Sequence, residues 1–482
     1  MRFVIGLDVG TTGTKAVVCD DKGKIYGKGY KEYDLIFGEG GRVSQRAEDW
    51  YCAACFAVRK AVSESGVEPS LVEALSLSTQ GASMLAVDKD FNSLCDVITW
   101  MDKSTGEEVA ELVSEFGEET LYRKAGWALS TSNDIPKILW LKKHSPEVFE
   151  KAYSFVSTLE YMNFRMTGNN VSDPTNTAIR SLMDIGTGSY DADILAYLGI
   201  SEDRLPKIAP AGSVVGKLTR GCAESFGLNE NVTVINGAHD QYCASLGSGA
   251  ISAGDMLVAT GTTWVVLGIA DKLVYTPSRV CPGIHPVKDL YGVMATLISA
   301  GSALKWYKNI IDTDYSDIDA GAAERRDSAK NILFAPYLAG AGFPHEDREA
   351  KAKIVGLELS HDKYDIALAL MEGVAFEAKT VLEEYKKFGC EISKLIMTGR
   401  TAHSDVWRGL VRDITNCEIL ITDEPDTCCV GAAVMAAVGA GIYPDYASAA
   451  SEMVKISKHD VPIAENVEFY KEKYQRYLNC FN

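Results

Sequence analysis

The sequence predicts an α/β protein built from two related domains that face each other across a cleft. Short β-type apolar runs alternate along the chain with longer helical ones. The chain has 482 residues, more than the roughly 250–300 that a single hydrophobic core usually reaches. A strand, a Gly-Thr-Thr turn and a second strand occur once in each half, at Gly10 and at Gly261. We therefore expect one such turn in each domain.

Composition excludes several classes of partner. The net charge is −18 and the isoelectric point is near 5.0, and no basic stripe is present, so we expect no nucleic-acid partner. No uninterrupted apolar run approaches the roughly 20 residues of a membrane span. Residues 1–8 lack the features of a signal peptide, and the 12 cysteines are scattered, which together predict reduced thiols in the cytoplasm.

The first element, "FVIGLDVGTTGTKAVV" at residues 3–18, reads as strand, turn and strand. A turn of glycine and threonine exposes backbone N–H groups and hydroxyls, which bind phosphate oxygens. Asp8 beside it is placed to hold Mg²⁺, which prefers oxygen ligands. The spacing matches neither a Walker P-loop nor a Rossmann fingerprint, and an ordinary β-hairpin is the alternative. The candidate phosphate ligands are Thr11, Thr12, Thr14 and Lys15, of which Lys15 could equally be a solvated strand residue.

The next elements are mostly helical. Residues 48–62 read as one amphipathic helix, so Cys52 and Cys55 are interpreted as packing residues, because no second pair completes a zinc site. Residues 74–88 read as strand, loop and strand. Residues 134–152 predict a helix opened at Pro136 and a second helix that starts at Ser145-Pro146.

The second half begins with the other glycine-threonine turn. "VATGTTWVVLG" at residues 258–268 reads as strand, turn and strand, and "LGSGAISAGD" before it is loop-like. We place the domain boundary there, which divides the chain into residues 1–248 and 249–482. Residues 360–389 predict a long helix with Ser360 as a plausible cap and Gly389 at its end. Two such turns from opposing domains could hold both ends of a polyphosphate.

These segments carry a resemblance to a known family. Residues 8–12 (Asp-Val-Gly-Thr-Thr) look like the first phosphate motif of the actin, hexokinase and heat-shock ATPase superfamily. The segments "GRVSQRAEDWY", "VITWMDKST" and "NGAHDQYCASLGSGAISAGDMLVATGTT" are similar, in this order, to segments of the FGGY family of carbohydrate kinases, and in particular of its xylulokinase-like members. The resemblance covers nearly the whole chain. It implies two actin-like (ribonuclease H-like) domains, each a mixed β-sheet flanked by helices.

The resemblance also implies a reaction, the transfer of the γ-phosphoryl group of ATP to a sugar or polyol hydroxyl, with Mg²⁺. Asp240, at a strand-to-helix transition, matches the catalytic base of the family, and with Asp8 it is a candidate metal ligand. Without the resemblance, Asp240 would be read as a helix cap. The next residue, Gln241, stands where some members of the family bind a substrate hydroxyl, and His239 is either a pocket residue or a packed neutral one.

The sugar side is expected at Gln80, Trp100 and Asp102, which match family positions. Recognition of a polyol needs directional donors and acceptors and an aromatic wall. The alternatives are that Trp100 belongs to the core and that Asp102 is a surface acid. Gly81 and Ala82 stand where xylulokinases carry a bulkier Met-His pair, and this departure enlarges the pocket or moves its contacts.

The nucleotide side is expected at Gly261, Thr262 and Gly301 for the phosphates, and at Gly399 and Arg400 for the adenosine. Arg400-Thr401 replace small residues of the family pattern, and the guanidinium could stack on a base or crowd the pocket. A second departure is the segment 341–343 (Ala-Gly-Phe), where relatives often carry Glu-Arg-Thr. It bears on the substrate or on a contact between subunits.

Three functions are compatible with the sequence. The first is a kinase acting on a small sugar or polyol, foremost a ketopentose such as xylulose, with glycerol, ribulose or a deoxy-ketose as other acceptors. The second is a non-catalytic sugar or nucleotide sensor on the same fold. The third, an actin-like filament or chaperone-type ATPase, would need neither Trp100 nor Asp102. The resemblance also allows a homodimer.

Overall fold

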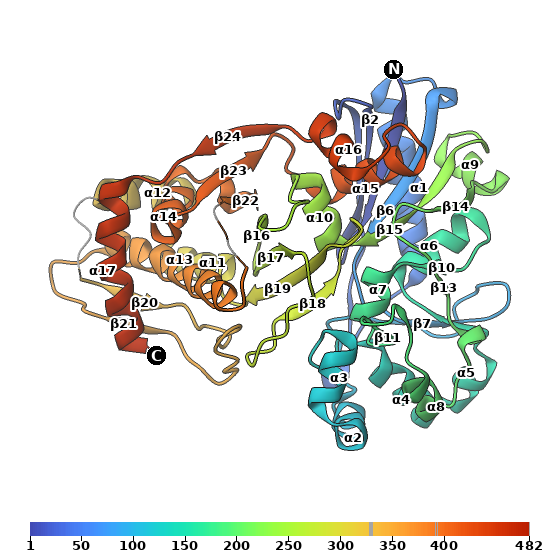
Figure 1. The fold of residues 1–482 in the computed structure, drawn as a ribbon, viewed down its shortest axis with the longest axis horizontal. Coiled ribbons are helices and arrows are strands. Elements are labelled where there is room, and N and C mark those ends of the chain that lie inside the picture. Colours follow the sequence, from blue (N-terminus) through green and yellow to red (C-terminus); the bar gives the residue numbers. More distant parts are fainter. Residues whose placement is uncertain (327–330, 391, 393, 482) are drawn as a thin grey trace. The chain divides into compact units, whose positions relative to one another are not determined.

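The computed structural model describes residues 1–326, 331–390, 392 and 394–481. The chain divides into two compact units (Figure 1). The first unit comprises Met1–Ile251, Cys281–Tyr291 and Asp426–Lys455, and the second comprises Ser252–Val280, Gly292–Pro425 and Ile456–Asn482. Two segments that follow the predicted boundary at residue 248 therefore pack with the N-terminal half of the chain. The predicted boundary cuts the chain once, whereas each of the two units is made of three separate segments.

The first unit is built on a mixed six-stranded sheet in the order β14-β15-β6-β1-β2-β3. Its central strands β15, β6 and β1 are parallel, and the flanking pairs are antiparallel. The strands are β1 (Phe3–Val9), β2 (Gly13–Asp20), β3 (Ile25–Glu32), β6 (Val72–Thr79), β14 (Val214–Lys217) and β15 (Thr233–His239). Apolar residues on β1 and β6 are almost wholly buried, as expected of strands with helices on both faces.

Helices and short strands complete this unit. The helices are α1 (Ala47–Ser65), α2 (Gly106–Phe116), α3 (Glu118–Ala125), α4 (Asp134–His144), α5 (Pro146–Lys151), α6 (Thr158–Thr167), α7 (Pro174–Ile179), α8 (Ala192–Leu198), α9 (Arg220–Phe226), α10 (Asp240–Ser248), α15 (Thr427–Gly439) and α16 (Tyr446–Met453). The short strands are β4 (Ile36–Phe37), β5 (Val43–Gln45), β7 (Leu85–Val87), β8 (Val97–Ile98), β9 (Ser154–Val156), β10 (Val171–Ser172), β11 (Met183–Asp184), β12 (Ser189–Tyr190), β13 (Lys207–Ile208) and β18 (Cys281–Ile284). The helix predicted over residues 48–62 and the strands predicted around the 80–84 loop are confirmed.

One edge of the central sheet gathers the ends of three parallel strands. Val9 pairs with Thr79, and Thr79 pairs with His239, so β1, β6 and β15 end side by side. The residues that follow these strands begin the first glycine-threonine turn, the loop at Gln80 and the helix at Asp240. Because carboxyl ends of parallel strands share one edge, three segments far apart in sequence meet there.

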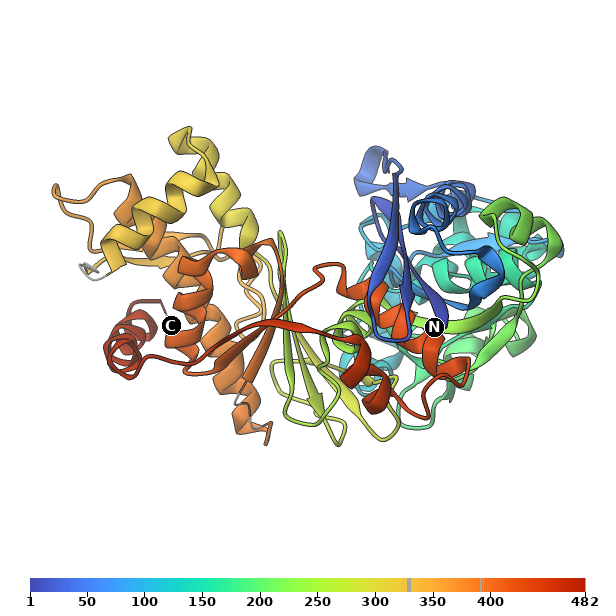
Figure 2. The same cartoon turned by 90° about the horizontal axis from the view of Figure 1, so that it is seen from above.

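Helix α15 comes from late in the chain and packs on the face of this sheet opposite to α1 (Figure 2). Helix α15 lies so close to its neighbours that only glycine fits at three contact points, which are Gly6, Gly247 and Gly431. A Cβ at Gly6 of β1 would lie 1.9 Å from the carbonyl oxygen of Cys429, and one at Gly247 of α10 would lie 1.9 Å from that of Thr427. Helix α15 therefore holds β1 and α10 in place together.

The second unit also has a mixed sheet, which includes the consecutive strands β19-β17-β16-β22-β23-β24. Strands β16, β22 and β23 are parallel, whereas β17 and β24 are antiparallel to their neighbours β16 and β23. The strands are β16 (Met256–Thr260), β17 (Trp264–Ala270), β19 (Tyr291–Leu297), β20 (Leu333–Ala335), β21 (Lys353–Val355), β22 (Lys394–Gly399), β23 (Glu418–Thr422) and β24 (Ile456–Asp460). The helices are α11 (Gly301–Ile311), α12 (Tyr315–Arg325), α13 (Lys363–Lys387), α14 (Asp405–Thr415) and α17 (Ala464–Phe481).

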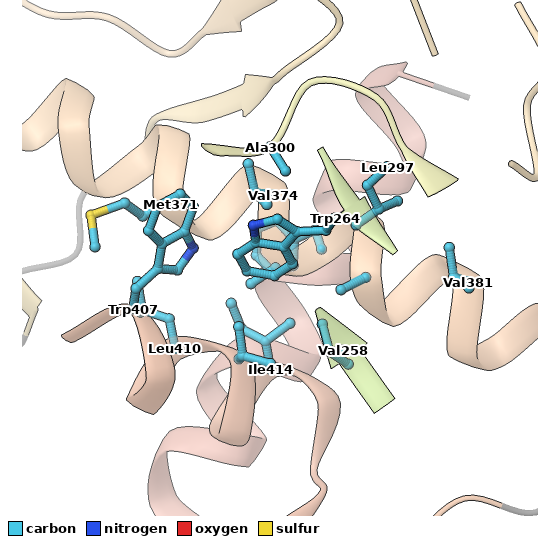
Figure 3. Packing of buried hydrophobic residues seen from close by; sticks show 14 of the residues in the cluster. Val258, Trp264, Leu297, Ala300, Met371, Val374, Val381, Trp407, Leu410 and Ile414 are labelled. Carbon is cyan, nitrogen blue, oxygen red and sulfur yellow. The ribbon is translucent and has the colours of Figure 1, made fainter. Parts of the chain in front are cut away.

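The core of the second unit forms between this sheet and helices α13 and α14. Trp264 and Trp407 lie at its centre with ring centroids 5.3 Å apart, beside Val258, Leu410 and Ile414 (Figure 3). Both indoles are almost completely buried. The two buried tryptophans fix the spacing between the sheet and α14.

The long helix α13 corrects one prediction. Its N-cap is Asp362, whose side chain accepts from the backbone N–H of Tyr364 and Asp365, and not Ser360. Asp365 completes a capping box by accepting from the N–H of Asp362. The carboxylates of Asp362 and Asp365 together accept from three backbone N–H groups at the start of this helix.

None of the described helices combines the length and the apolar character that crossing a membrane requires.

Candidate active site

The first glycine-threonine turn is a hairpin between β1 and β2, as predicted. The N–H of Gly10 donates to the carbonyl oxygen of Gly13 at 3.1 Å, and the hydroxyl of Tyr33 donates to the carbonyl oxygen of Gly10. Thr12 is exposed at the tip and Thr11 is partly exposed, whereas Thr14 is buried and its hydroxyl lies 3.5 Å from that of Tyr33. Of the predicted threonine ligands, Thr11 and Thr12 are the accessible ones.

Asp8 lies one residue before the end of β1, beside this turn, and its side chain is hydrogen-bonded to the adjacent strand. Its Oδ1 accepts from the hydroxyl of Ser78, on the adjacent strand β6, at 2.7 Å. Burial raises the pKa of the Asp8 carboxyl to about 7; the Ser78 hydrogen bond opposes this rise, and the neighbouring charge of Asp240 adds to it. The negative charges of the Asp8 and Asp240 carboxylates therefore repel each other at this edge of the sheet.

Asp240 is the first residue of α10, directly after β15. Its Oδ1 is buried and accepts no hydrogen bond within the described part of the chain. The nearest cationic candidate is His239, whose Nε2 lies 3.3 Å from that oxygen. The Sγ of Cys428 on α15 donates to the backbone carbonyl of Asp240 at 3.5 Å. Asp240 is thus not a helix cap, and its Oδ1 has the imidazole of His239 as a neighbour but no hydrogen-bond donor among the described residues.

Two carboxylates that repel each other suit a divalent cation. The donor set, Asp8 and Asp240, is made of the hard oxygens that Mg²⁺ prefers. No group of three or more His, Cys, Asp or Glu side chains within the described residues could hold a metal without further ligands. This fits Mg²⁺, which binds through one or two carboxylates and completes its shell with water and phosphate oxygens. The residues present therefore fit the predicted ion.

On the sugar side, Gln80 and Trp100 are both tied to the first turn. The indole N–H of Trp100 donates to the hydroxyl of Thr11 at 3.0 Å, and Trp100 is 41% exposed, so it is not a core residue. Its role as a wall of the sugar site stays a prediction. The side chain of Gln45 donates to the carbonyl oxygen of Thr11 at 2.6 Å and accepts from Gln80 at 3.1 Å. Gln45 was missed in the sequence, although it lies in a segment that matches the family.

Asp102 is placed differently from the other predicted sugar ligands. It is 3% exposed, so it is not a surface acid. Its Oδ2 accepts from the N–H of Val43 at 2.8 Å, and its Oδ1 accepts from the N–H and the hydroxyl of Ser104 at 2.8 and 2.6 Å. These bonds bind the segment after β8 to β5. Both oxygens are occupied by the protein, and a contact with sugar stays a prediction.

The small residue at position 81 is explained by its neighbour. A Cβ at Gly81 would lie 2.6 Å from Cδ2 and 3.0 Å from Nε2 of His239. The imidazole therefore fills the space beside the Gln80 loop, and the side chain of His239 is 8% exposed. Ala82 follows with a φ of 52°, and its carbonyl oxygen accepts from the buried ammonium of Lys137 at 2.6 Å. The departure at residues 81–82 does not leave a simple void.

Lys15 is neither free nor fully solvated. Its ammonium lies 2.5 Å from the Oδ1 of Asp426, which precedes α15. Burial alone would lower the pKa of Lys15, but the hydrogen bond to Asp426 and the charge of Asp8 outweigh it and raise that pKa. The side chain stays protonated next to the first turn. Asp426 could not be found from the sequence, because 411 residues separate the two partners.

In the second unit the other predicted turn joins β16 to β17. The N–H of Gly261 donates to the carbonyl oxygen of Thr263 at 3.2 Å, and Thr260 pairs with Trp264. Helix α11 begins against this turn. A Cβ at its first residue, Gly301, would lie 2.2 Å from the carbonyl oxygen of Gly261, and the N–H of Ser302 donates to the carbonyl oxygen of Thr262 at 2.9 Å. The structure brings Gly261, Thr262 and Gly301 together.

The segment at Gly399 reaches the same turn from the neighbouring strand. Gly399 ends β22, pairs with Thr260, has a φ of 88°, and would place a Cβ 2.2 Å from the carbonyl oxygen of Thr260. Only glycine allows this approach. Arg400 follows with an exposed side chain. At the other departure, Gly342 packs against β19, where a Cβ would lie 2.3 Å from the carbonyl oxygen of Thr296.

Taken together, the first unit gathers Asp8, Asp240, Gln80 and Trp100 at one sheet edge, and the second gathers glycines around a hairpin. The residues that sequence reasoning missed are supports of these groups, namely Ser78, Gln45, Tyr33 and Asp426. The chemistry available is a carboxylate oxygen without a hydrogen-bond partner among the described residues, beside amide and indole side chains and a turn of glycine and threonine. This combination suits the transfer of a phosphoryl group to an alcohol.

Comparison with known proteins agrees with this chemistry. The model of the N-terminal domain of the FGGY family of carbohydrate kinases matches residues 3–247, and that of the C-terminal domain matches residues 256–440. The chain is 28% identical to a xylulose kinase of Bacillus subtilis (strain 168), over 100% of this chain and 97% of the relative. It is 25% identical to a gluconokinase of Bacillus licheniformis, over 99% and 95%.

A solved structure shows the same fold. The ligand-bound xylulose kinase of Lactobacillus acidophilus superposes with a TM-score of 0.93 at 26% identity, over 100% of this chain and 98% of the other. The prediction of two actin-like domains with helix-flanked mixed sheets is confirmed, and so is the prediction of a kinase over a sensor or a filament protein. The chain belongs to the FGGY family of carbohydrate kinases and is a sugar kinase.

Proposed function

We propose that the protein transfers the γ-phosphoryl group of ATP to a hydroxyl of a ketopentose such as xylulose, with Asp240 as the general base. The observation that carries the proposal is the Oδ1 of Asp240, which is buried at the start of α10 and yet accepts no hydrogen bond among the described residues. An unpartnered buried carboxylate oxygen costs free energy, and a substrate hydroxyl would satisfy it.

In this mechanism Asp240 accepts the proton of the attacking hydroxyl, which then displaces the γ-phosphoryl group. Phosphoryl transfer needs little covalent help from the protein, so positioning and charge neutralisation supply most of the rate. Asp8 and Asp240 would hold Mg²⁺, which neutralises phosphate charge when bound. Lys15, kept protonated by Asp426, adds a positive charge next to the first turn.

The two glycine-threonine turns support the assignment of ATP as donor. Each presents backbone N–H groups and threonine hydroxyls in a hairpin, and in the second unit three glycines keep side chains away from it. We assign Thr11, Thr12, Gly261, Thr262 and Gly301 to the phosphates. Gly399 and Arg400, at the end of β22, are assigned to the adenosine.

The acceptor is assigned from the relatives and from the sugar-side residues. The similar proteins include xylulose kinases and a gluconokinase, which suggests a short open-chain substrate. A smaller neutral polyol, such as glycerol, is the second candidate, because the His239 ring occupies the space beside Gly81. Gln80, Trp100 and Gln241 are the residues that we expect to contact it.

The test is the release of ADP from MgATP over a panel of ketoses, polyols and aldonates, with the wild type and Asp240→Asn. We expect one short sugar to stimulate release strongly. Asp240→Asn should lower kcat at least about 1,000-fold while it leaves the affinity for ATP within about threefold. Near-normal turnover in this variant would remove Asp240 from the role of base. A wild type that no compound stimulates would contradict the proposed substrate class.

A further inference from the structure

Trp50, Gln45 and Gln80 form a relay of hydrogen bonds, and the chemistry of their donors and acceptors fixes how each amide is oriented. Trp50 on α1 donates its indole N–H to the Oε1 of Gln45 at 3.2 Å. An indole N–H can only donate, so the atom that it meets must be the amide oxygen of Gln45. The Nε2 of Gln45 then faces the carbonyl oxygen of Thr11 at 2.6 Å, and a carbonyl can only accept. Both ends of the Gln45 amide are therefore set.

This orientation passes on to Gln80. The Oε1 of Gln45 also accepts from the Nε2 of Gln80 at 3.1 Å, so Gln80 must turn its NH₂ group toward Gln45. Its own oxygen is left on the other side of the amide. That oxygen, Oε1 of Gln80, is buried and has no hydrogen-bond partner among the residues that the structure describes, and Gln80 is 1% exposed. Gln45 and Trp50 are equally buried, so water cannot easily reorient the relay.

Two more acceptors without a partner among the described residues follow β15, the strand next to β6, which Gln80 follows. The Oδ1 of Asp240 and the Oε1 of Gln241 are also buried without a hydrogen-bond partner in the described part of the chain. Thr79 pairs with His239, so Gln80 and Asp240 leave neighbouring strands at the same sheet edge. The unsatisfied groups of this edge are thus all oxygens that accept hydrogen bonds.

The basic groups near this edge face protein oxygens. The Nε2 of His239 lies 3.3 Å from the Oδ1 of Asp240, so a positive charge on this ring would be paired with that carboxylate. Lys137 is bound by the carbonyl oxygens of Ala82 and Ser132 and lies 3.7 Å from Asp134. Lys15 is bound by Asp426, and the guanidinium of Arg180 contacts Asp134 and Glu160. A carboxylate on the substrate would meet acceptor oxygens and the charges of Asp8 and Asp240, whereas hydroxyl groups would supply the missing donors.

We propose that Trp50 and Gln45 are positioning residues that fix the amide of Gln80 with its oxygen toward the acceptor, and that they thereby select an uncharged polyhydroxy acceptor over a sugar acid. This inference rests on the proposed function, and it deepens it by naming the residues that select the acceptor.

The first experiment compares acceptors. The neutral compound that stimulates ADP release most is measured against the aldonate of the same chain length, with both kcat/KM and binding by calorimetry on the full chain. We expect the neutral compound to be favoured at least about 100-fold. Equal or better use of the aldonate would overturn this inference and leave the kinase assignment intact. If no compound stimulates ADP release, xylulose and the corresponding aldonate are compared by binding alone. Binding of xylulose but not of the aldonate would then support the inference and reject xylulose as the phosphoryl acceptor, and binding of neither would overturn the inference.

The second experiment tests the relay itself. Trp50→Phe keeps a buried aromatic ring and removes the donor that orients Gln45. We expect the KM for the acceptor to rise about tenfold, with kcat and the KM for ATP within about twofold, since only the orientation of Gln80 is released. Gln45→Leu should raise the KM for the acceptor at least as much, together with the KM for ATP, because it also frees the carbonyl oxygen of Thr11. Trp50→Phe in that background should add less than twofold to the KM for the acceptor.

Trp264→Phe is the matched control for the relay experiment. Trp264 is as deeply buried as Trp50, but its Nε1 has no hydrogen-bond partner among the described residues. It should lose thermal stability as Trp50→Phe does and leave the acceptor KM unchanged. If the two tryptophan variants change the acceptor KM alike, or if Trp50→Phe raises the KM for ATP as much as that for the acceptor, the relay has no directing role.

Discussion

The indole N–H of Trp100 donates to the hydroxyl of Thr11 at 3.0 Å. This bond joins the proposed sugar site to the tip of the first glycine-threonine turn. The carbonyl oxygen of Thr11 also accepts a hydrogen bond from Gln45. The two halves of the proposed reaction centre in the first unit are therefore held by one residue.

Trp100→Phe should raise the KM for ATP, although Trp100 is assigned to the sugar side of the site. The phenyl ring keeps the apolar wall but frees the Thr11 hydroxyl, and one such bond contributes about 1 kcal/mol, or about fivefold. We expect the KM for ATP to rise about fivefold in steady-state kinetics. Thr11→Val removes the same bond together with the proposed phosphate contact of the hydroxyl, so the double variant should lose no more than Thr11→Val alone. Multiplicative losses would mean that the bond has no such role.

Asp8→Asn should separate stability from catalysis. Burial raises the pKa of Asp8 to about 7, so above pH 7 the folded protein carries a carboxylate that its surroundings disfavour. The amide removes that cost while it can still accept from Ser78. Without Mg²⁺ we expect a higher melting temperature at pH 8, and in activity assays a rise of at least about tenfold in the Mg²⁺ concentration for half-maximal rate.

Ser78→Ala is the control for this prediction, because it removes the hydrogen bond and keeps the charge. It should change the Mg²⁺ dependence by less than about threefold. An Asp8→Asn enzyme with wild-type Mg²⁺ dependence would exclude Asp8 as a ligand.

Gly431→Ala should unfold the first unit at lower temperature. A Cβ at this position of α15 would lie 1.8 Å from the carbonyl oxygen of Cys243 on α10, so the helices must separate. Overpacking usually costs about 1–3 kcal/mol, and a clash with backbone belongs at the upper end, although alanine itself favours a helix by about 1 kcal/mol. Gly221→Ala in α9, where a Cβ would meet nothing within 4 Å, should be neutral or stabilising. Denaturant unfolding of both variants measures the difference.

His285 should make the protein sensitive to acid. Burial lowers the pKa of His285 to about 3. Its Nδ1 accepts from the N–H of Val287, and its Nε2 lies 3.2 Å from the hydroxyl of Ser245. Below about pH 6.5 the unfolded chain binds a proton that the folded chain refuses, so stability falls by up to about 1.4 kcal/mol per pH unit.

His285→Gln removes this contribution. Its melting temperature should fall less than that of the wild type between pH 7 and pH 4.5, whatever the difference at pH 7. Parallel curves for the two proteins would show that the histidine is protonated in the fold.

The sequence predicted the local parts of this protein well, because they depend on near neighbours. The hairpins at Gly10 and Gly261 follow from strand, glycine-threonine and strand within about 16 residues, and α1 follows from its amphipathic pattern. The resemblance to the family supplied the reaction, and the comparisons confirm the family and the kinase activity. The roles of Asp240 and the other site residues remain predictions.

What the sequence could not predict depends on contacts between distant segments. The pairing of Lys15 with Asp426, the packing of His239 against Gly81 and the saturation of Asp102 by Val43 and Ser104 leave no periodic signal. The cap at Asp362 was missed because two candidate residues precede the same helix and only backbone geometry chooses between them.

The late helix α15 has a consequence for biosynthesis. When residue 251 leaves the ribosome, the sheet of the first unit is fully synthesised, but the face at Gly6 still lacks the helix that covers it. A nascent chain must hold this apolar surface unprotected until residue 455 has been made, with the second unit emerging in between. A fragment ending near residue 250 would be an aggregation-prone product, and co-expressing the remaining chain is the way to keep it in solution.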